Sequence, residues 1–230
     1  MNFKIIKFIY ATLAVIIIST LTVYGDEVAN TITKNEFLYT IKQYVKTAEI
    51  LDRNDKSRLE YFERAAELSR DLINNHPDSD IGYAYLAYSL GSITRDVPFY
   101  KKISVAKEIK KAIDRSLSLN KDNHLAWFVA GMFYRESSKI DGFQRKLAEK
   151  YLNDIMKDAS FEKAIACFKK AIELNKESLQ YRYELAKTYQ DIGKKEIALV
   201  EYKRILAIQT DEKKDIIYQH KAQIQLKKIS

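Results

Sequence analysis

The feature that most constrains this chain of 230 residues is an internal repeat in its C-terminal third. Three positions there recur 34 residues further on with similar residue types, Ala164, Phe168 and Ala171 returning as Ala198, Tyr202 and Ile205. Self-similarity at a fixed period of this length is typical of proteins that stack copies of one small unit, because a single copy cannot bury its own apolar side. The sequence therefore predicts an array of short units, each packed against the next.

Helical periodicity runs through the rest of the chain. Between Asn35 and Leu51 the apolar residues are separated by one, three or four positions, so they fall on one side of a helix. The chain contains only 6 Gly and 2 Pro. That is too few for the frequent turns of a sheet-rich fold, and the glycines are too far apart for a phosphate-binding loop. We therefore predict an all-α fold.

The segment between the two copies narrows the type of repeat. It contains Leu185-Ala186, then Tyr189, then Gly193, and this order resembles the tetratricopeptide repeat (TPR). The resemblance implies a solenoid of helix hairpins with inserted helices, closed by a C-terminal capping helix at about 211–229. Helices approach closely only where the residues at the crossing are small. The residues expected at such crossings are Ala87, Gly131, Ala171, Ala186 and Ala198.

Two of the repeats carry inserted segments, and these segments indicate which family of TPR proteins the chain resembles. In the second insertion the apolar residues Ile140, Phe143, Leu147 and Tyr151 are three or four positions apart and predict an added helix over about 140–152. The insertions, with segments 96–102, 107–111, 124–127 and 158–164, resemble the regulator of microtubule dynamics family and its bacterial exported relatives. The resemblance covers about residues 57–208 and implies the fold. Eukaryotic members are linked to microtubules, a role we do not expect for an exported chain.

The first 25 residues have the pattern of a targeting segment. Lys4 and Lys7 precede an uncharged run from Phe8 to Tyr24, and Gly25 suits a signal-peptidase cleavage site. We predict a signal peptide over 1–25, with an uncleaved membrane anchor as the alternative, although the run is shorter than the roughly 20 residues of a spanning helix. The predicted TPR helical domain is 26–230. It would lie in the periplasm or at the extracytoplasmic face of a membrane, where the N-terminal segment could also associate with the bilayer.

Residue types that carry catalysis are scarce and scattered. His76, His124 and His220 are far apart in sequence, and none has a second histidine or cysteine at metal-binding spacing. Cys167 lies in a predicted packing helix, where a buried thiol acts as a small apolar residue. We therefore predict a chain that is not an enzyme, with no catalytic residues, no metal site and no cofactor.

Positive charge is concentrated in one segment. The formal net charge is +8, and Lys107, Lys111 and Arg115 recur every four residues, so they share one side of a helix. The simpler interpretation is a solvated helix face. The alternative is docking to an acidic protein or an anionic membrane surface, which would weaken with salt. Nucleic acid is not predicted, because its sites combine a denser basic patch with aromatic residues.

The remaining candidate site is the concave surface of the solenoid. The first helix of each hairpin lines the inner groove, and aromatic side chains there offer large contact area at low entropic cost. The predicted groove residues are Tyr85, Tyr88, Phe128, Met132, Arg135, Tyr183, Lys187 and Gln190. We predict a non-catalytic scaffold that binds a protein or peptide partner there. Two alternatives stay open, namely that the rings simply fill the solenoid, or that the chain is an auxiliary ligand-binding subunit of a solute-uptake system with an enclosed pocket.

Overall fold

The computed structural model describes residues 33–52, 54–94 and 98–229, and these form helices and connecting turns without any strand. They belong to a compact unit, Lys34–Ser230. The predicted signal peptide, 1–25, lies outside the described residues. The helices are α2 (Lys34–Ile50), α3 (Lys56–Asn75), α4 (Asp80–Ile93), α5 (Phe99–Leu119), α6 (His124–Ser138), α7 (Gly142–Asp158), α8 (Phe161–Leu174), α9 (Leu179–Asp191), α10 (Lys195–Leu206) and α11 (Lys213–Ile229).

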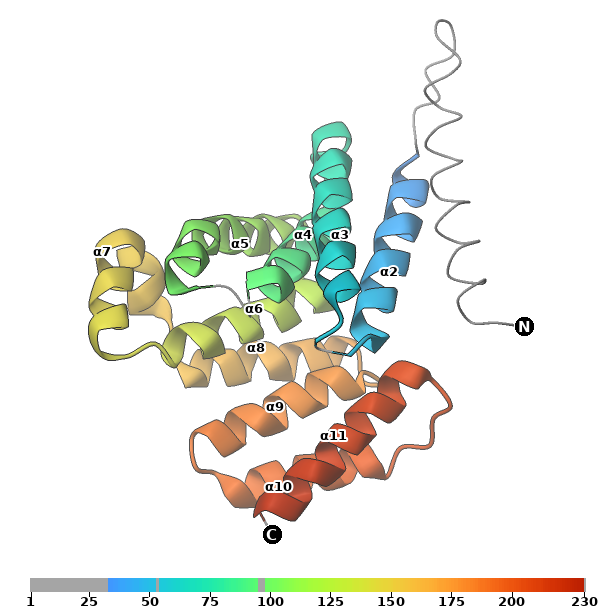
Figure 1. Cartoon of the computed structure of the whole chain (residues 1–230), viewed down its shortest axis with the longest axis vertical. Coiled ribbons are helices and arrows are strands. Elements are labelled where there is room, and N and C mark those ends of the chain that lie inside the picture. Colours follow the sequence, from blue (N-terminus) through green and yellow to red (C-terminus); the bar gives the residue numbers. More distant parts are fainter. Residues whose placement is uncertain (1–32, 53, 95–97, 230) are drawn as a thin grey trace, which may run out of the picture. The chain divides into compact units, whose positions relative to one another are not determined.

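The helices pack as antiparallel hairpins that stack side by side (Figure 1). The hairpins are α2 with α3, α4 with α5, α6 with α8, and α9 with α10. Neighbouring hairpins join through α3 and α4, α4 and α6, and α8 and α9, and α11 closes the array against α9 and α10. The predicted all-α TPR-type solenoid with a C-terminal capping helix is therefore confirmed. Within the described part of the chain, no helix combines the length and apolar character needed to cross a bilayer.

Side-chain caps fix where many of the helices begin. Five polar residues stand just before a helix and accept a hydrogen bond from one of its first free backbone N–H groups, as N-caps do. They are Asp55, Ser79, Asn123, Ser160 and Ser178. Because Pro77 cannot extend the helix that ends at Asn75, the chain turns there and Ser79 starts the next helix. The hairpin lengths thus follow from local sequence.

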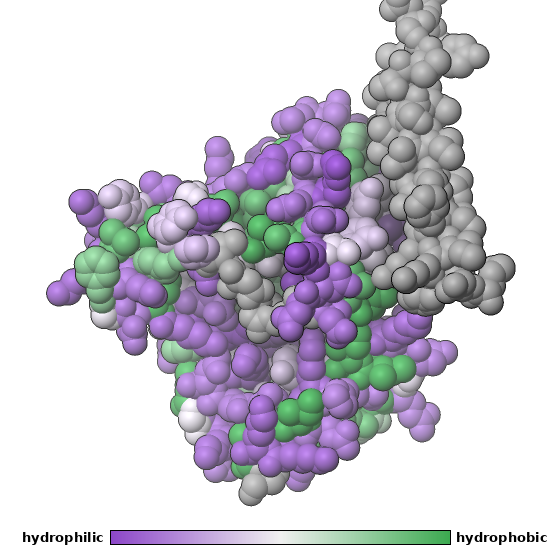
Figure 2. All heavy atoms as spheres, viewed as in Figure 1, coloured by the Kyte–Doolittle hydropathy of each residue, from purple (hydrophilic) through white to green (hydrophobic). Residues whose placement is uncertain are grey.

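Small residues lie where the helices cross. Ala164 and Ala198, the positions that define the repeat, are both 0% exposed, as predicted. Gly131 faces the ring of Phe168 across the α6–α8 contact, where an added Cβ would come within 2.7 Å of two ring carbons. Hydrophilic residues cover most of the outer face seen in Figure 2, and hydrophobic ones form small separate patches. The chain therefore buries its apolar side between hairpins.

The inserted helix α7 differs from its prediction in length and in the side it buries. It runs to Asp158, and its backbone departs from helical angles at Leu152 (φ −133°, ψ 33°). Half of the stripe that predicted it is exposed, Phe143 at 79% and Tyr151 at 52%, whereas Ile140 and Leu147 are half-buried. Instead α7 buries Ala148, Leu152 and Met156, which pack against Phe99, Ile103 and Ala106 of α5.

Candidate functional site

The predicted groove residues come from the first helices of three hairpins. Tyr85 and Tyr88 lie on α4, Phe128, Met132 and Arg135 on α6, and Tyr183, Lys187 and Gln190 on α9. Phe128, Arg135 and Tyr183 are buried, at 1%, 2% and 8% exposed, and the other five are half-buried. Their role in partner binding stays a prediction, because most of their surface contacts other parts of this chain.

A chain of aromatic rings connects the inner helices. The ring centroid of Tyr88 lies 6.1 Å from those of Phe62 on α3 and Phe128 on α6. Phe128 in turn stacks on Tyr181 of α9 at 4.3 Å. Sequence reasoning found Tyr88 and Phe128 but missed Tyr181. Tyr181 lies three residues after its N-cap Ser178, and Gly82 lies three residues after its N-cap Ser79. Comparison of the repeats therefore suggests a small residue at this position and gives no sign of an aromatic contact.

Polar contacts of Tyr88 tie three helices together. Its hydroxyl donates to the carboxylate of Glu49 on α2 and accepts a hydrogen bond from Nε2 of Gln180 on α9 at 2.9 Å. Burial, and then the negative charge of Glu49, raises the pKa of Tyr88 well above its ordinary value. The same two causes raise the pKa of Tyr85 to about 12. Both tyrosines therefore stay neutral hydrogen-bonding groups and have no acid–base role near neutral pH.

Helix α11, which packs on α10, also contacts two of the predicted groove residues of α9. The centroid of Tyr218 on α11 lies 5.5 Å from that of Tyr183, and Nε2 of Gln190 donates to Gln225 at 3.3 Å. At the other end, Nζ of Lys214 pairs with Glu49 at 2.7 Å. The last helix thus contacts α9 and reaches across to α2 (Figure 1).

Arg135 is an internal link between α6 and α9. Its guanidinium lies 2.6 Å from a carboxylate oxygen of Glu184 and donates to the Glu184 carbonyl at 3.2 Å. Burial opposes the charge, but Glu184 outweighs it, so the pKa of Arg135 stays above its ordinary value. Lys139 and Asp191 form a second ion pair between these helices at 2.5 Å. A buried, fully paired arginine positions helices and is unavailable to a ligand in this arrangement.

Reactive side chains are dispersed. Burial raises the pKa of the Cys167 thiol to about 11, which disfavours the nucleophilic thiolate. Nδ1 of His124 lies 2.8 Å from the Tyr181 hydroxyl, and burial lowers its pKa. Among the residues that the structure describes, histidine, cysteine and acidic side chains do not gather in threes at a point where an ion could sit.

Two clefts open on the outer surface. The larger, about 600 Å³, lies over α4 and α5 and is open to solvent. Its apolar part comes from Tyr83, Leu86 and Ala112, and Lys111 and Arg115 line its edge. A smaller one on α3 is lined by Glu60, Glu63, Arg64 and Glu67. Neither is the enclosed pocket that the solute-uptake alternative requires.

A family model described as "Regulator of microtubule dynamics protein 1-3" matches residues 20–230. The chain belongs to this family. The match extends the predicted resemblance of about 57–208 at both ends. The matched range spans every described helix, α7 included.

A solved structure of a TPR protein supports the fold. The chain is similar to TTC0263, a thermophilic TPR protein of Thermus thermophilus, with a TM-score of 0.51 and 15% identity over 83% of this chain and 92% of that one. A second similar structure is MamA, with a TM-score of 0.41 and 16% identity over 77% of this chain and 96% of that one. The sequence matches no curated protein. Identities this low bear on the fold alone.

Proposed function

We propose that this chain is an exported, non-catalytic scaffold that binds a helical segment of a protein partner in its concave groove. TPR folds generally mediate contacts between proteins, and family and fold both favour a scaffold. The observation that supports the finer proposal is that α11, which packs on α10, also contacts α9 and α2. In this proposal α11 covers part of the groove as a bound partner helix would.

The contacts of α11 have the character of a helix held in a groove. Tyr218 supplies the aromatic contact to Tyr183, and Ala222 is fully buried beside it. Gln225 adds a hydrogen bond to Gln190, and Lys214 adds an ion pair to Glu49. The anchors at 214, 218, 222 and 225 are three or four residues apart, the spacing by which amphipathic helices enter grooves.

Few side chains of α11 are fully buried, although Gln219 also donates hydrogen bonds to the carbonyls of Ile205 and Ile208. Of its 17 residues only Tyr218 and Ala222 are buried, and Ile216 and Ile224 remain 48% and 39% exposed. Elements with few buried apolar contacts open more readily than the core of a protein. Because α11 is the last described helix, its release would leave the four hairpins in place. A partner helix with more apolar surface would displace it.

Supplying α11 in trans tests the proposal. The chain ending at Glu212 is mixed with a fluorescent peptide of residues 213–229, and binding is followed by fluorescence anisotropy. We expect the peptide to bind the shortened chain and not the full chain, whose groove is occupied. The control peptide carries Tyr218→Ala with Ala222→Lys and should not bind. If the shortened chain keeps its helicity and cooperative unfolding but neither peptide binds, the groove is not a helix-binding site.

Export is tested separately by the mass and compartment of the native protein. A chain recovered outside the cytoplasm and beginning at Asp26 supports cleavage of segment 1–25. A membrane-bound chain that retains the segment supports the anchor. An intact chain in the soluble cytoplasmic fraction contradicts export.

A further inference from the structure

We propose that the corner formed by the start of α5 and the N-terminal half of α7 docks on an anionic membrane surface. The corner is defined by Tyr100, Lys101 and Lys102 of α5 and by Phe143, Lys146 and Lys150 of α7. This surface is separate from the concave groove, so the proposal stands whether or not α11 exchanges with a partner.

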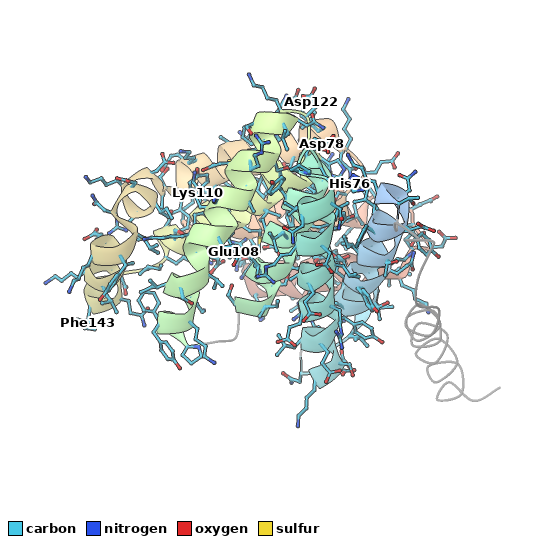
Figure 3. The ribbon with its side chains drawn as sticks, turned by 90° about the horizontal axis from the view of Figure 1, so that it is seen from above. His76, Asp78, Glu108, Lys110, Asp122 and Phe143 are labelled. Carbon is cyan, nitrogen blue, oxygen red and sulfur yellow. The ribbon has the colours of Figure 1, made fainter. Side chains whose placement is uncertain are left out.

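Exposed aromatic residues mark the corner. Phe143 is 79% exposed and Tyr100 is 65% exposed. Figure 3 shows Phe143 at the projecting end of α7, on the side toward which α5 runs from its labelled middle residues Lys110 and Glu108 back to its start. Leaving a phenylalanine this exposed in water gains nothing for the fold, whereas aromatic rings are favoured at the interface between a bilayer and water.

The charges around these rings are mostly positive. Lys101, Lys146 and Lys150 are exposed and form no ion pair with another described residue, and Lys102 is exposed beside them. Of the acidic residues near Phe143, Glu149 is paired with Arg145 at 2.9 Å, and Asp141 is exposed just before α7. Anionic lipid headgroups attract lysine side chains that lie near the membrane surface. The long apolar stem of lysine lets its ammonium group stay in the headgroup layer while nearby aromatic rings insert.

The corner is held rigidly and projects outward. Ala148, Leu152 and Met156 of α7 pack against Phe99, Ile103 and Ala106 of α5, so α7 is anchored on the first half of α5. The larger open cleft lies further along α5, at residues 108–118, and the smaller lies on α3. A protruding aromatic and basic corner matches a bilayer surface, into which the rings can insert, better than a folded partner, which would need a matching hollow.

Vesicle sedimentation tests the proposal. Since Lys34–Ser230 is a compact unit, the chain from Asp26 onward is used, which removes the apolar segment 8–24. We expect it to sediment with phosphatidylcholine vesicles that contain phosphatidylglycerol, and not with phosphatidylcholine alone. Raising the salt from about 0.05 M to about 0.5 M should release it, because screening shortens the reach of the charges.

Two variants separate the rings from the charges. The ring variant combines Tyr100→Ser with Phe143→Ser, and the charge variant combines Lys101→Gln, Lys146→Gln and Lys150→Gln. Each should lower the partition constant between vesicles and water at least about tenfold. The matched controls are Tyr39→Ser, at a tyrosine 67% exposed on α2, and the triple Lys169→Gln, Lys195→Gln, Lys203→Gln on α8 and α10. Both controls should bind like the parent chain.

Three outcomes would overturn the proposal. Equal sedimentation of the ring variant and the parent would reduce the effect to unspecific charge attraction. Equal loss in the control lysine variant would mean that net charge decides binding and the corner does not. Capture of poly-glutamate by the parent and not by the charge variant, with no vesicle binding by either, would assign the corner to an acidic protein.

Discussion

The contact between Gly131 and Phe168 gives the sharpest test of how the hairpins pack. An added Cβ at position 131 would lie 2.7 Å from Cδ1 and from Cε1 of the Phe168 ring. The ring is 0% exposed and lies 5.9 Å from the ring of Phe128, so it has little room to move. We therefore expect Gly131→Ala to overpack the α6–α8 contact.

The magnitude follows from two opposing effects. Overpacking a well-filled core costs about 1–3 kcal/mol. Replacing glycine by alanine within a helix gains up to about 1 kcal/mol in helix propensity. Gly91 of α4 supplies the matched control, because it is exposed and an added Cβ there has no neighbour within 4 Å. The difference between the two variants largely cancels the propensity gain and isolates the overpacking.

Urea and thermal unfolding followed by circular dichroism would measure this difference. Gly131→Ala should be less stable than Gly91→Ala by about 1–3 kcal/mol, which for a domain of this size is a gap of roughly 2–12 °C in Tm. Combining Gly131→Ala with Phe168→Leu should recover part of the loss, since the clashing ring is gone. A Gly131→Ala chain as stable as Gly91→Ala would refute the close α6–α8 approach.

Three further predictions concern single contacts. Ala198→Leu, at a position that is 0% exposed, should lower the free energy of unfolding by about 1–3 kcal/mol in urea, and an unchanged midpoint would contradict the repeat alignment. Tyr88→Phe leaves Glu49 and Gln180 without the hydroxyl that they share and should cost about 1–3 kcal/mol, whereas the exposed Tyr39→Phe should cost almost nothing. Burial, and then the charge of Lys42, lowers the pKa of His124 in the folded state. The folded chain should therefore lose stability as the pH drops from the unfolded-state pKa of about 6.5 toward about 5, because the unfolded chain binds the proton more readily. His124→Gln should flatten that part of a plot of Tm against pH.

Much of the hairpin array could be predicted from local sequence. The recurrence of Ala164 at Ala198 indicates a crossing because only small residues permit the close approach of two helices, and both are fully buried. Because Pro77 stops the preceding helix, the sequence limits the next cap to Asp78 or Ser79, and the structure has Ser79. Such features depend on neighbours in the chain, so the sequence carries them directly.

The inserted helix shows where periodicity falls short. Two stripes interleave on α7, one through Phe143 and Tyr151 and one through Ala148 and Leu152. The first contains the larger apolar residues and predicted the helix, but the second meets α5. Spacing identifies a helix without telling which stripe finds a partner, because that depends on where another helix lies. The exposed Phe143 is the consequence.

The candidate groove shows the same limit for a site. Its residues could be assigned to the first helices of the hairpins, where the structure has them. The contact of α11 with these helices could not be predicted, because it joins residues far apart in sequence, such as Glu49 with Lys214 and Tyr183 with Tyr218. No local pattern reports a contact of that kind.

The seating of α11 across the groove is the central claim, and zero-length carbodiimide cross-linking of the monomer, read by mass spectrometry, tests it most directly. The reagent joins an amine to a carboxylate only where the two are in contact. We predict a bond between Lys214 and Glu49, 2.7 Å apart, alongside the internal control between Lys139 and Asp191, 2.5 Å apart. Recovery of the control bond without any link between α11 and α2 would contradict the account.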